Sequence, residues 1–203
     1  MMNLWPEILL VLLAYSLGSI PFGYLFTKKL TGKNILDLGS GNIGSTNVGR
    51  FAGKKVAVLT QVCDMSKGLL PVLLVYYLTS EKICYFENYF IFLVAFATIL
   101  GHDFSIFLKL RGGKGVNTTL GASLLLAPYS VAISVLVYFI VRWKYKFVSF
   151  GSICLAFFLT ITDLVIHEIS FLTFYLCLCS CLILIKHRGN MMRLLDGEEF
   201  HPI

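Results

Sequence analysis

The sequence predicts an all-α integral membrane protein, a compact bundle of about seven transmembrane helices forming one domain over residues 1–203. Of its residues, 57% are hydrophobic and 14% charged, whereas a soluble domain has about one quarter charged residues. The mean hydropathy is +0.81. A backbone in lipid must satisfy its own hydrogen bonds, so long apolar runs are expected to be helices. Such runs lie at about residues 5–27, 56–79, 83–101, 116–141, 147–163 and 169–185.

The fourth run decides between six and seven spans. It contains Pro128, and a proline often marks the first turn of a new helix. A break there gives two helices, 116–127 and 129–142, and so seven spans instead of six. The first of the two has twelve residues and would be about 18 Å long. It is too short to cross a bilayer alone, so it is expected to be shielded by neighbouring helices or to line a groove.

The distribution of charge favours seven spans with the N-terminus outside and the C-terminus in the cytoplasm, because cytoplasmic loops carry an excess of Lys and Arg. Six spans would place Arg142, Lys144 and Lys146 outside. With seven, fifteen of the 17 basic residues lie inside: Lys28, Lys29, Lys33, Arg50, Lys54, Lys55, Lys109, Arg111, Lys114, Arg142, Lys144, Lys146, Lys186, Arg188 and Arg193. The apolar stretch in residues 5–27 is expected to stay as the first span, not to be a cleaved leader.

Three polar, basic segments interrupt the apolar runs: residues 39–50 (GSGNIGSTNVGR), 101–121 (GHDFSIFLKLRGGKGVNTTLG) and 187–199 (HRGNMMRLLDGEE). Glycine allows backbone N–H groups to approach a phosphate, and Lys or Arg neutralises its charge. With seven spans all three segments meet on the cytoplasmic face. We therefore expect phosphate chemistry at a membrane surface.

The first two segments each contain part of a nucleotide-binding pattern. Gly39, Gly41 and Gly44 match G-x-G-x-x-G, with Asp64 twenty residues beyond Gly44, but that fingerprint needs a strand before it and a crossover helix after it. The run Gly112 to Gly115 includes Lys114 but lacks the Ser or Thr of a P-loop. Neither nucleotide site is expected. What remains is a glycine loop with a lysine that opens a helix, whose N-terminus favours anions.

In the third segment, His187 and Asn190 are spaced to share one helical face. Asp64 and Lys67 have the same spacing inside the second span, where charges are costly, and we expect them to form a structural pair. Neither His102 nor His187 has an acid five residues later. The H-x-x-x-x-D pattern of the common glycerolipid acyltransferases is therefore absent.

Taken together, the three segments closely resemble the acyl-phosphate-dependent glycerol-3-phosphate acyltransferases of the PlsY type. That family has G-S-G-N-I-G-A-T-N-x-x-R, then G-H-x-F-P-x-F-L-x-F-x-G-G-K-G-V-A-T, then H-R-x-N-I-x-R-L-L-x-G-x-E. The likeness runs from about residue 14 to 199 and includes GSIPFGYL (18–25) and DMSKG (64–68). The departures, none at a charged position, are Ser45, Ser105, Leu110, Asn117 and Met191.

The resemblance implies transfer of a fatty acyl group from acyl phosphate to the 1-hydroxyl of sn-glycerol 3-phosphate. The products would be lysophosphatidic acid and phosphate, an early step of bacterial phospholipid synthesis. It also implies a multi-pass protein of the bacterial cytoplasmic (inner) membrane with its active site facing the cytosol. Acyl phosphate is already activated, so no cofactor, metal or enzyme nucleophile is expected. We expect a monomer, working beside an enzyme that produces acyl phosphate.

The residues suit this chemistry, because two phosphate-bearing substrates need cations and hydrogen-bond donors around them. The expected catalytic residues, which bind and orient glycerol 3-phosphate, are Ser40, Arg50, Lys114, His187 and Asn190. Further binding residues, with backbone amides for the acyl phosphate, are expected at Gly41, Asn42, Gly44, Thr46, Asn47, Gly112, Gly113, Gly115, Arg188 and Glu199. The general base is either His187 or a substrate phosphate. The acyl chain is expected in a groove between helices, beside the short fourth helix.

Three other classes fit less well. There is no basic tail and no aromatic-interleaved basic face, so nucleic acid is not an expected partner. A small transporter of an anionic phosphorylated metabolite is the alternative, but its binding residues should lie near the midplane and the sequence shows no internal repeat. A purely structural protein leaves the glycine loop unexplained.

Overall fold

The computed structural model describes residues 5–199. Over these residues all regular structure is helical, which confirms the all-α class. The chain divides into two compact units, Met1–Leu125 and Leu126–Ile203, called below the N-terminal and the C-terminal unit. The prediction of a single domain stays a prediction.

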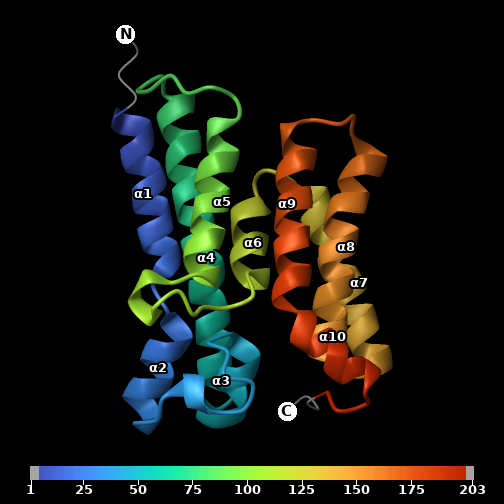
Figure 1. Ribbon diagram of the computed structural model, residues 1–203. Helices are drawn as coiled ribbons and strands as arrows, with labels where there is room; N and C mark the ends of the chain where they lie inside the picture. The colour runs from blue at the N-terminus through green and yellow to red at the C-terminus, as the bar shows by residue number, and fades with distance from the viewer. Residues whose placement is uncertain (1–4, 200–203) are drawn as a thin grey trace. The chain divides into compact units, whose positions relative to one another are not determined.

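The N-terminal unit contains the helices that lead into the first two polar segments (Figure 1). These are α1 (Trp5–Ser19), α2 (Phe22–Thr31), α3 (Ser45–Ala52), α4 (Lys54–Ser80), α5 (Phe90–Asp103) and α6 (Val116–Ser123), with short 3-10 turns at Ile35–Asp37 and Ile106–Leu108. Helix α1 packs on α5, and α4 packs on α5 and α6. Helices α2 and α3 pack on the first part of α4.

Small residues bring these helices together, as is usual in membranes. A methyl group added at Gly68 of α4 would collide with the backbone of Thr118 in α6, and one at Gly121 would collide with the backbone of Met65. Helix α6 has eight residues instead of the predicted twelve, and Thr118 to Ser123 within it are all buried. Its neighbours therefore shield this short helix, as predicted.

Of the prolines in the predicted spans, Pro21 and Pro128 break helices, whereas Pro71 lies inside α4. Pro128 is the first residue of α7, so the predicted break in the fourth run is confirmed. The first run was predicted as one span over 5–27, but α1 ends at Ser19 and α2 begins at Phe22. Pro21 lies between them with φ −93° and ψ 73°, and Phe22 N–H donates to the Ile20 carbonyl at 3.2 Å. This is an inverse γ-turn, and it arises because proline has no N–H to continue the helix.

The third predicted span begins too early. Helix α4 continues to Ser80 and α5 starts only at Phe90, whereas the prediction placed its start at residue 83. The intervening stretch contains Lys82, in a left-handed conformation with φ 55°, and Glu87. A turn exposes these charges to water, which a helix in lipid would not do.

The C-terminal unit contains α7 (Pro128–Tyr145), α8 (Val148–Ile166), α9 (Phe171–Lys186) and α10 (Arg188–Leu195). Helix α8 packs on α7 and α9, and α10 packs on the ends of α8 and α9. Buried Asp163 joins α8 to α9, because its Oδ2 accepts a 2.7 Å hydrogen bond from the Thr173 hydroxyl. A capping box of Ser170 and Thr173 starts α9.

The surface of both units is that of a multi-pass integral membrane protein. Large apolar side chains such as Leu70, Phe139 and Phe174 are exposed on the long helices, where a bilayer would cover them. Within residues 5–199, four segments are long and apolar enough to cross a membrane: Trp5–Thr31, Lys54–Ser80, Phe90–Leu108 and Val148–Ile166. The pair α9 and α10, bent by 54°, makes a fifth if it counts as one span. Seven spans and their orientation stay a prediction.

Candidate active site

The first polar segment folds around the side chain of Asn47, which is 2% exposed on α3. Its Nδ2 donates to the carbonyls of Leu38 and Asn42, both at 2.9 Å. Its Oδ1 accepts from the Ser40 N–H at 3.2 Å. Asn47 therefore holds the loop in shape. Gly41, with φ +64°, makes the turn inside this loop.

Asn42 connects the first polar segment to the second. Its Oδ1 accepts from the Gly44 N–H at 2.8 Å, an Asx turn that leads into α3. Its Nδ2 donates to the carbonyl of Gly112 at 3.4 Å. A second link joins Asn117 Nδ2 to the Ser45 hydroxyl, also at 3.4 Å. The structure thus brings together two of the three segments that the sequence predicted to meet.

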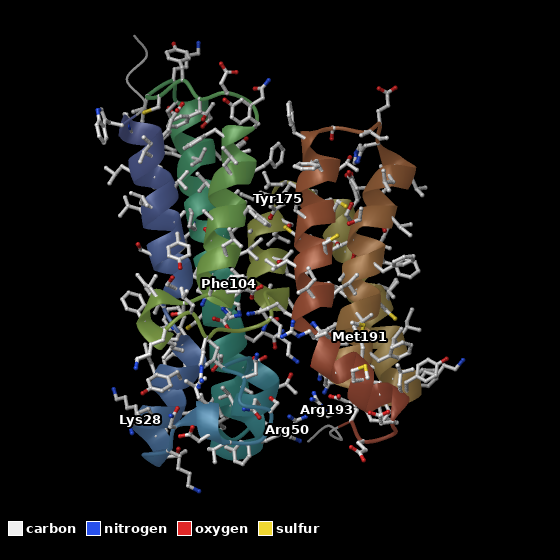
Figure 2. The ribbon with its side chains drawn as sticks, in the orientation of Figure 1. Lys28, Arg50, Phe104, Tyr175, Met191 and Arg193 are labelled. Atoms are coloured by element: carbon white, nitrogen blue, oxygen red, sulfur yellow. The ribbon has the colours of Figure 1, made fainter. Side chains whose placement is uncertain are left out.

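Helix α3 positions the remaining predicted residues of the first segment. Thr46 lies in its first turn and Arg50 in its last, both half-buried (Figure 2). Ser40 lies in the loop before α3 and is also half-buried. The positive end of the α3 dipole faces the loop that contains Gly41 and Asn42. A hydroxyl, backbone amides and a guanidinium are thereby gathered in one loop and helix.

The glycines of the second segment let its loop fold tightly onto the end of α5. Gly113 N–H donates to the His102 carbonyl at 2.9 Å, and a methyl group at Gly113 would overlap the His102 imidazole. Gly115 has φ +75° and immediately precedes α6. Lys114 is half-buried between these two glycines. The predicted loop that opens a helix is therefore present, with the lysine at its centre.

The sequence interpretation missed two buried residues beneath this loop. His102 is 4% exposed and Asp103 is fully buried, at the end of α5. The Asp103 carboxylate lies against Gly115, 3.2 Å from where a side chain there would begin. The run Gly101-His102-Asp103 offered a signal, since ionisable residues at the end of an apolar helix usually have partners.

The third segment lies in the C-terminal unit, at the junction of α9 and α10. His187 ends α9 and precedes α10, and it is 3% exposed. Its Nδ1 forms a 2.8 Å hydrogen bond with the Ile183 carbonyl. A carbonyl only accepts, so Nδ1 carries a proton and Nε2 has the lone pair whenever the ring is neutral. Arg188 is exposed at the first residue of α10.

Glu199 fastens the chain that follows α10. Its Oε1 accepts from Asn190 Nδ2 at 2.7 Å, and its Oε2 accepts from Arg193 Nε at 3.1 Å. Glu199 and Asn190 are 7% and 6% exposed. Arg193, labelled in Figure 2, is partly exposed. This geometry gives Glu199 the same kind of role as Asn47, because both of its oxygens bind the protein itself.

These elements suit the binding of phosphate esters. The N-terminal unit offers amides, hydroxyls and two cations, Arg50 and Lys114, on linked loops. The C-terminal unit offers an imidazole held by its Nδ1 and a cation, Arg188, at the start of a helix. Rigid donors of this kind stabilise negative charge that develops during acyl transfer.

The model of the family described as glycerol-3-phosphate acyltransferase matches residues 8–197. The chain belongs to the glycerol-3-phosphate acyltransferase family. One curated member, from Clostridium acetobutylicum, is 42% identical over 193 residues, which cover 95% of this chain and 98% of the relative.

This family member also shares its fold with solved structures. The crystal structure of PlsY (YgiH), an integral membrane glycerol 3-phosphate acyltransferase, in its glycerol 3-phosphate form matches with a TM-score of 0.88 and 34% identity. The lysophosphatidic acid form of the same protein matches with a TM-score of 0.85 and 33% identity. Each match covers 97% of this chain and 95% of the PlsY chain. The family resemblance seen in the sequence is therefore confirmed.

Proposed function

We propose that this glycerol-3-phosphate acyltransferase takes its acyl group from acyl phosphate. Acyl transfer to glycerol 3-phosphate, which forms lysophosphatidic acid, follows from membership of the family and from the likeness to PlsY. The observation that supports a phosphate-bearing donor is the pair of linked loops, 38–47 and 112–115, joined by Asn42 and Gly112. Two loops of amides beside Arg50 and Lys114 suit two phosphate groups. The alternative of a metabolite transporter is not favoured, because the family is one of acyltransferases.

Each group has a proposed role in the reaction. Ser40, Arg50, Lys114, His187 and Asn190 bind and orient glycerol 3-phosphate, with Arg188 as a further cation. Amides near Gly41 to Gly44 and Gly112 to Gly115 hold the acyl phosphate. The 1-hydroxyl oxygen bonds to the acyl carbon, its proton goes to a base, and the bond to phosphate breaks. Because the donor is already activated, the protein contributes position and charge.

The base is either His187 or a substrate phosphate. The hydrogen bond from His187 Nδ1 to the Ile183 carbonyl supports the first possibility, because it leaves the lone pair on Nε2 of the neutral ring. The charge of the two substrates supports the second, since a phosphate oxygen can accept the proton without any protein group. Both fit the same positioning by Lys114 and Arg50.

The location that we propose is the bacterial inner membrane, with seven spans, the N-terminus outside and the active site facing the cytosol. Fifteen of 17 basic residues then lie inside. The third polar segment then lies on the same face as the first two. The protein works as a monomer, supplied by an enzyme that produces acyl phosphate, and its acyl chain lies beside α6.

The donor is tested with purified protein in detergent or liposomes. Palmitoyl phosphate and labelled glycerol 3-phosphate are expected to give labelled lysophosphatidic acid, while palmitoyl-CoA with the same acceptor gives none. The physical reason is that the leaving phosphate fits a loop of amides and lysine, whereas a thioester presents no such group at its reacting carbon. Use of palmitoyl-CoA alone would overturn the donor assignment.

The orientation is tested by fusing reporters to the C-terminus of the full chain in bacterial cells. Seven spans place that end inside, so a fused green fluorescent protein should fluoresce and a fused alkaline phosphatase should be inactive. Six spans with the same N-terminal orientation reverse both results. An active phosphatase fusion would therefore remove the proposal that Pro128 separates two spans.

A further inference from the structure

A buried ion pair lies on α4, inside the N-terminal unit. Asp64 and Lys67 of α4 are each 2% exposed, and the Lys67 ammonium lies 2.9 Å from Asp64 Oδ1. A well-packed apolar pair is often as stable as a buried ion pair, so stability alone does not account for these charges. Ionisable groups inside a membrane helix usually have a functional reason. The other contacts of Asp64 and Lys67 indicate what this functional reason is.

Lys67 fixes the break between α1 and α2. Its Nζ donates to the Ile20 carbonyl at 2.8 Å and lies 5.6 Å from the centre of the Phe22 ring. At the preceding residue, the Ser105 hydroxyl donates to the Ser19 carbonyl at 2.6 Å. The proline break is therefore held both by α4 and by the chain that leads into the glycine loop.

A second hydrogen bond and the path of the chain also connect α1 to the start of the second polar segment. Tyr15 of α1 donates its hydroxyl to the Phe104 carbonyl at 2.7 Å. Phe104, labelled in Figure 2, follows α5 and begins the stretch that crosses to α6 in Figure 1. The end of α1 and the start of the second loop thus form one hydrogen-bonded structure.

Asp64 links this structure to the glycine loop through His102. The Nδ1 of His102 lies 3.5 Å from the same Asp64 Oδ1 that contacts Lys67. The imidazole forms the floor on which Gly113 rests, and the His102 carbonyl accepts the Gly113 N–H at 2.9 Å. Lys114 is the next residue. The backbone of Lys114 therefore directly follows the residue that packs on the imidazole.

We infer that Asp64, Lys67 and His102 are positioning residues, which act through Gly113 to set the place of Lys114 for phosphate binding. The inference rests on the proposed function, because it names what holds that site in shape. Asp64 and Lys67 thereby have a role in acyl transfer although they do not contact the substrate. This arrangement also explains why residue 113 is a glycine, because any side chain there would displace the His102 imidazole.

The first test replaces the network and keeps the fold. The variants are His102→Ala and the double variant Asp64→Leu/Lys67→Met, with Thr98→Val as the matched control. Thr98 is fully buried on α5, and its hydroxyl donates to the Val94 carbonyl of its own helix. Glycerol 3-phosphate binding is measured by calorimetry, and amide hydrogen exchange is followed in peptides that contain residues 112–115.

In both network variants the Kd for glycerol 3-phosphate is expected to rise about tenfold or more, since small displacements in a site have large effects. Exchange at Gly113 and Lys114 should accelerate while the Tm stays within about 4 °C of the parent. Thr98→Val should change neither quantity. Unchanged Kd and unchanged exchange in the network variants would overturn the inference.

The second test compares single and double variants at the contact between Gly113 and the His102 imidazole. Gly113→Ala should weaken binding strongly, because its methyl group meets the imidazole. Adding His102→Ala removes that collision. The Kd of the double variant for glycerol 3-phosphate should therefore be no higher than the higher of the two single-variant Kd values. If the fold-increase in Kd of the double variant equals the product of the two single-variant increases, Gly113 and His102 act independently, and the inference is overturned.

The outcome separates this inference from the donor assignment. Calorimetry and hydrogen exchange do not require turnover. If the parent protein fails to use palmitoyl phosphate but the variants show the expected changes in Kd and exchange, the donor assignment fails and the positioning network stands. If the donor assay succeeds and neither quantity changes, the network fails and the donor assignment stands.

Discussion

Replacement of His187 by alanine is expected to abolish acyl transfer while the helices remain folded. A positioned acid or base contributes about 10² to 10⁴ in rate, so kcat should fall by at least about 100-fold. His187 is buried at the junction of α9 and α10, where its ring is oriented by the Ile183 carbonyl. The measurement is kcat and KM with palmitoyl phosphate as donor, alongside the Tm of the purified variant.

His187→Asn provides the matched control, because its amide can still donate to the Ile183 carbonyl but has no counterpart of Nε2. It should be as inactive as the alanine variant if Nε2 does the work. Added imidazole separates the two candidate bases: it should partly restore turnover of His187→Ala if His187 accepts the proton, and it should have no effect if a substrate phosphate does. Near-normal kcat in both variants would exclude His187 from the site.

The two prolines show how far the sequence determines the helices. At Pro128 the charges of residues 142–146 gave an independent reason for a break, and α7 does begin there. At Pro21 no charge argument exists, so the apolar run predicts one helix. What the sequence could not show is that the freed carbonyls of Ser19 and Ile20 are bonded by Ser105 and Lys67. Those partners are more than 40 residues away along the chain.

The site residues show a different limit. Residue types were enough to predict a glycine loop with a lysine that opens α6, and its binding of phosphate stays a prediction. Residue types do not reveal which polar atoms are already in use, however. Asn47 and Glu199 are predicted to bind substrate, and both already hold hydrogen bonds within the protein: Asn47 to the loop before α3, and Glu199 to Asn190 and Arg193 of α10. Their contact with substrate stays a prediction. Helix α3 was also not predicted, because it has only eight residues and a polar sequence.

Replacement of Lys114 by alanine is expected to weaken phosphate binding more than it slows chemistry. A hydrogen bond to a charged group is worth about 1.5–3 kcal/mol, so KM for the phosphate substrates should rise about tenfold to 150-fold. The change in kcat should be smaller, because the lysine binds the phosphate in both the ground state and the transition state. Lys114→Arg keeps the charge and should recover part of the affinity.

Arg111→Ala is the matched control for this effect. Arg111 is an exposed cation three residues earlier in the same segment, at a position that the family pattern leaves variable. If Lys114 acts by direct contact, Arg111→Ala should leave KM close to that of the parent. At physiological salt, exposed charges more than about 8 Å apart are largely screened from each other. If both variants raise KM equally, a general positive field attracts the substrates and no specific contact is made. An unchanged KM in Lys114→Ala would contradict its place in the site and would remove the purpose of the network formed by Asp64, Lys67 and His102.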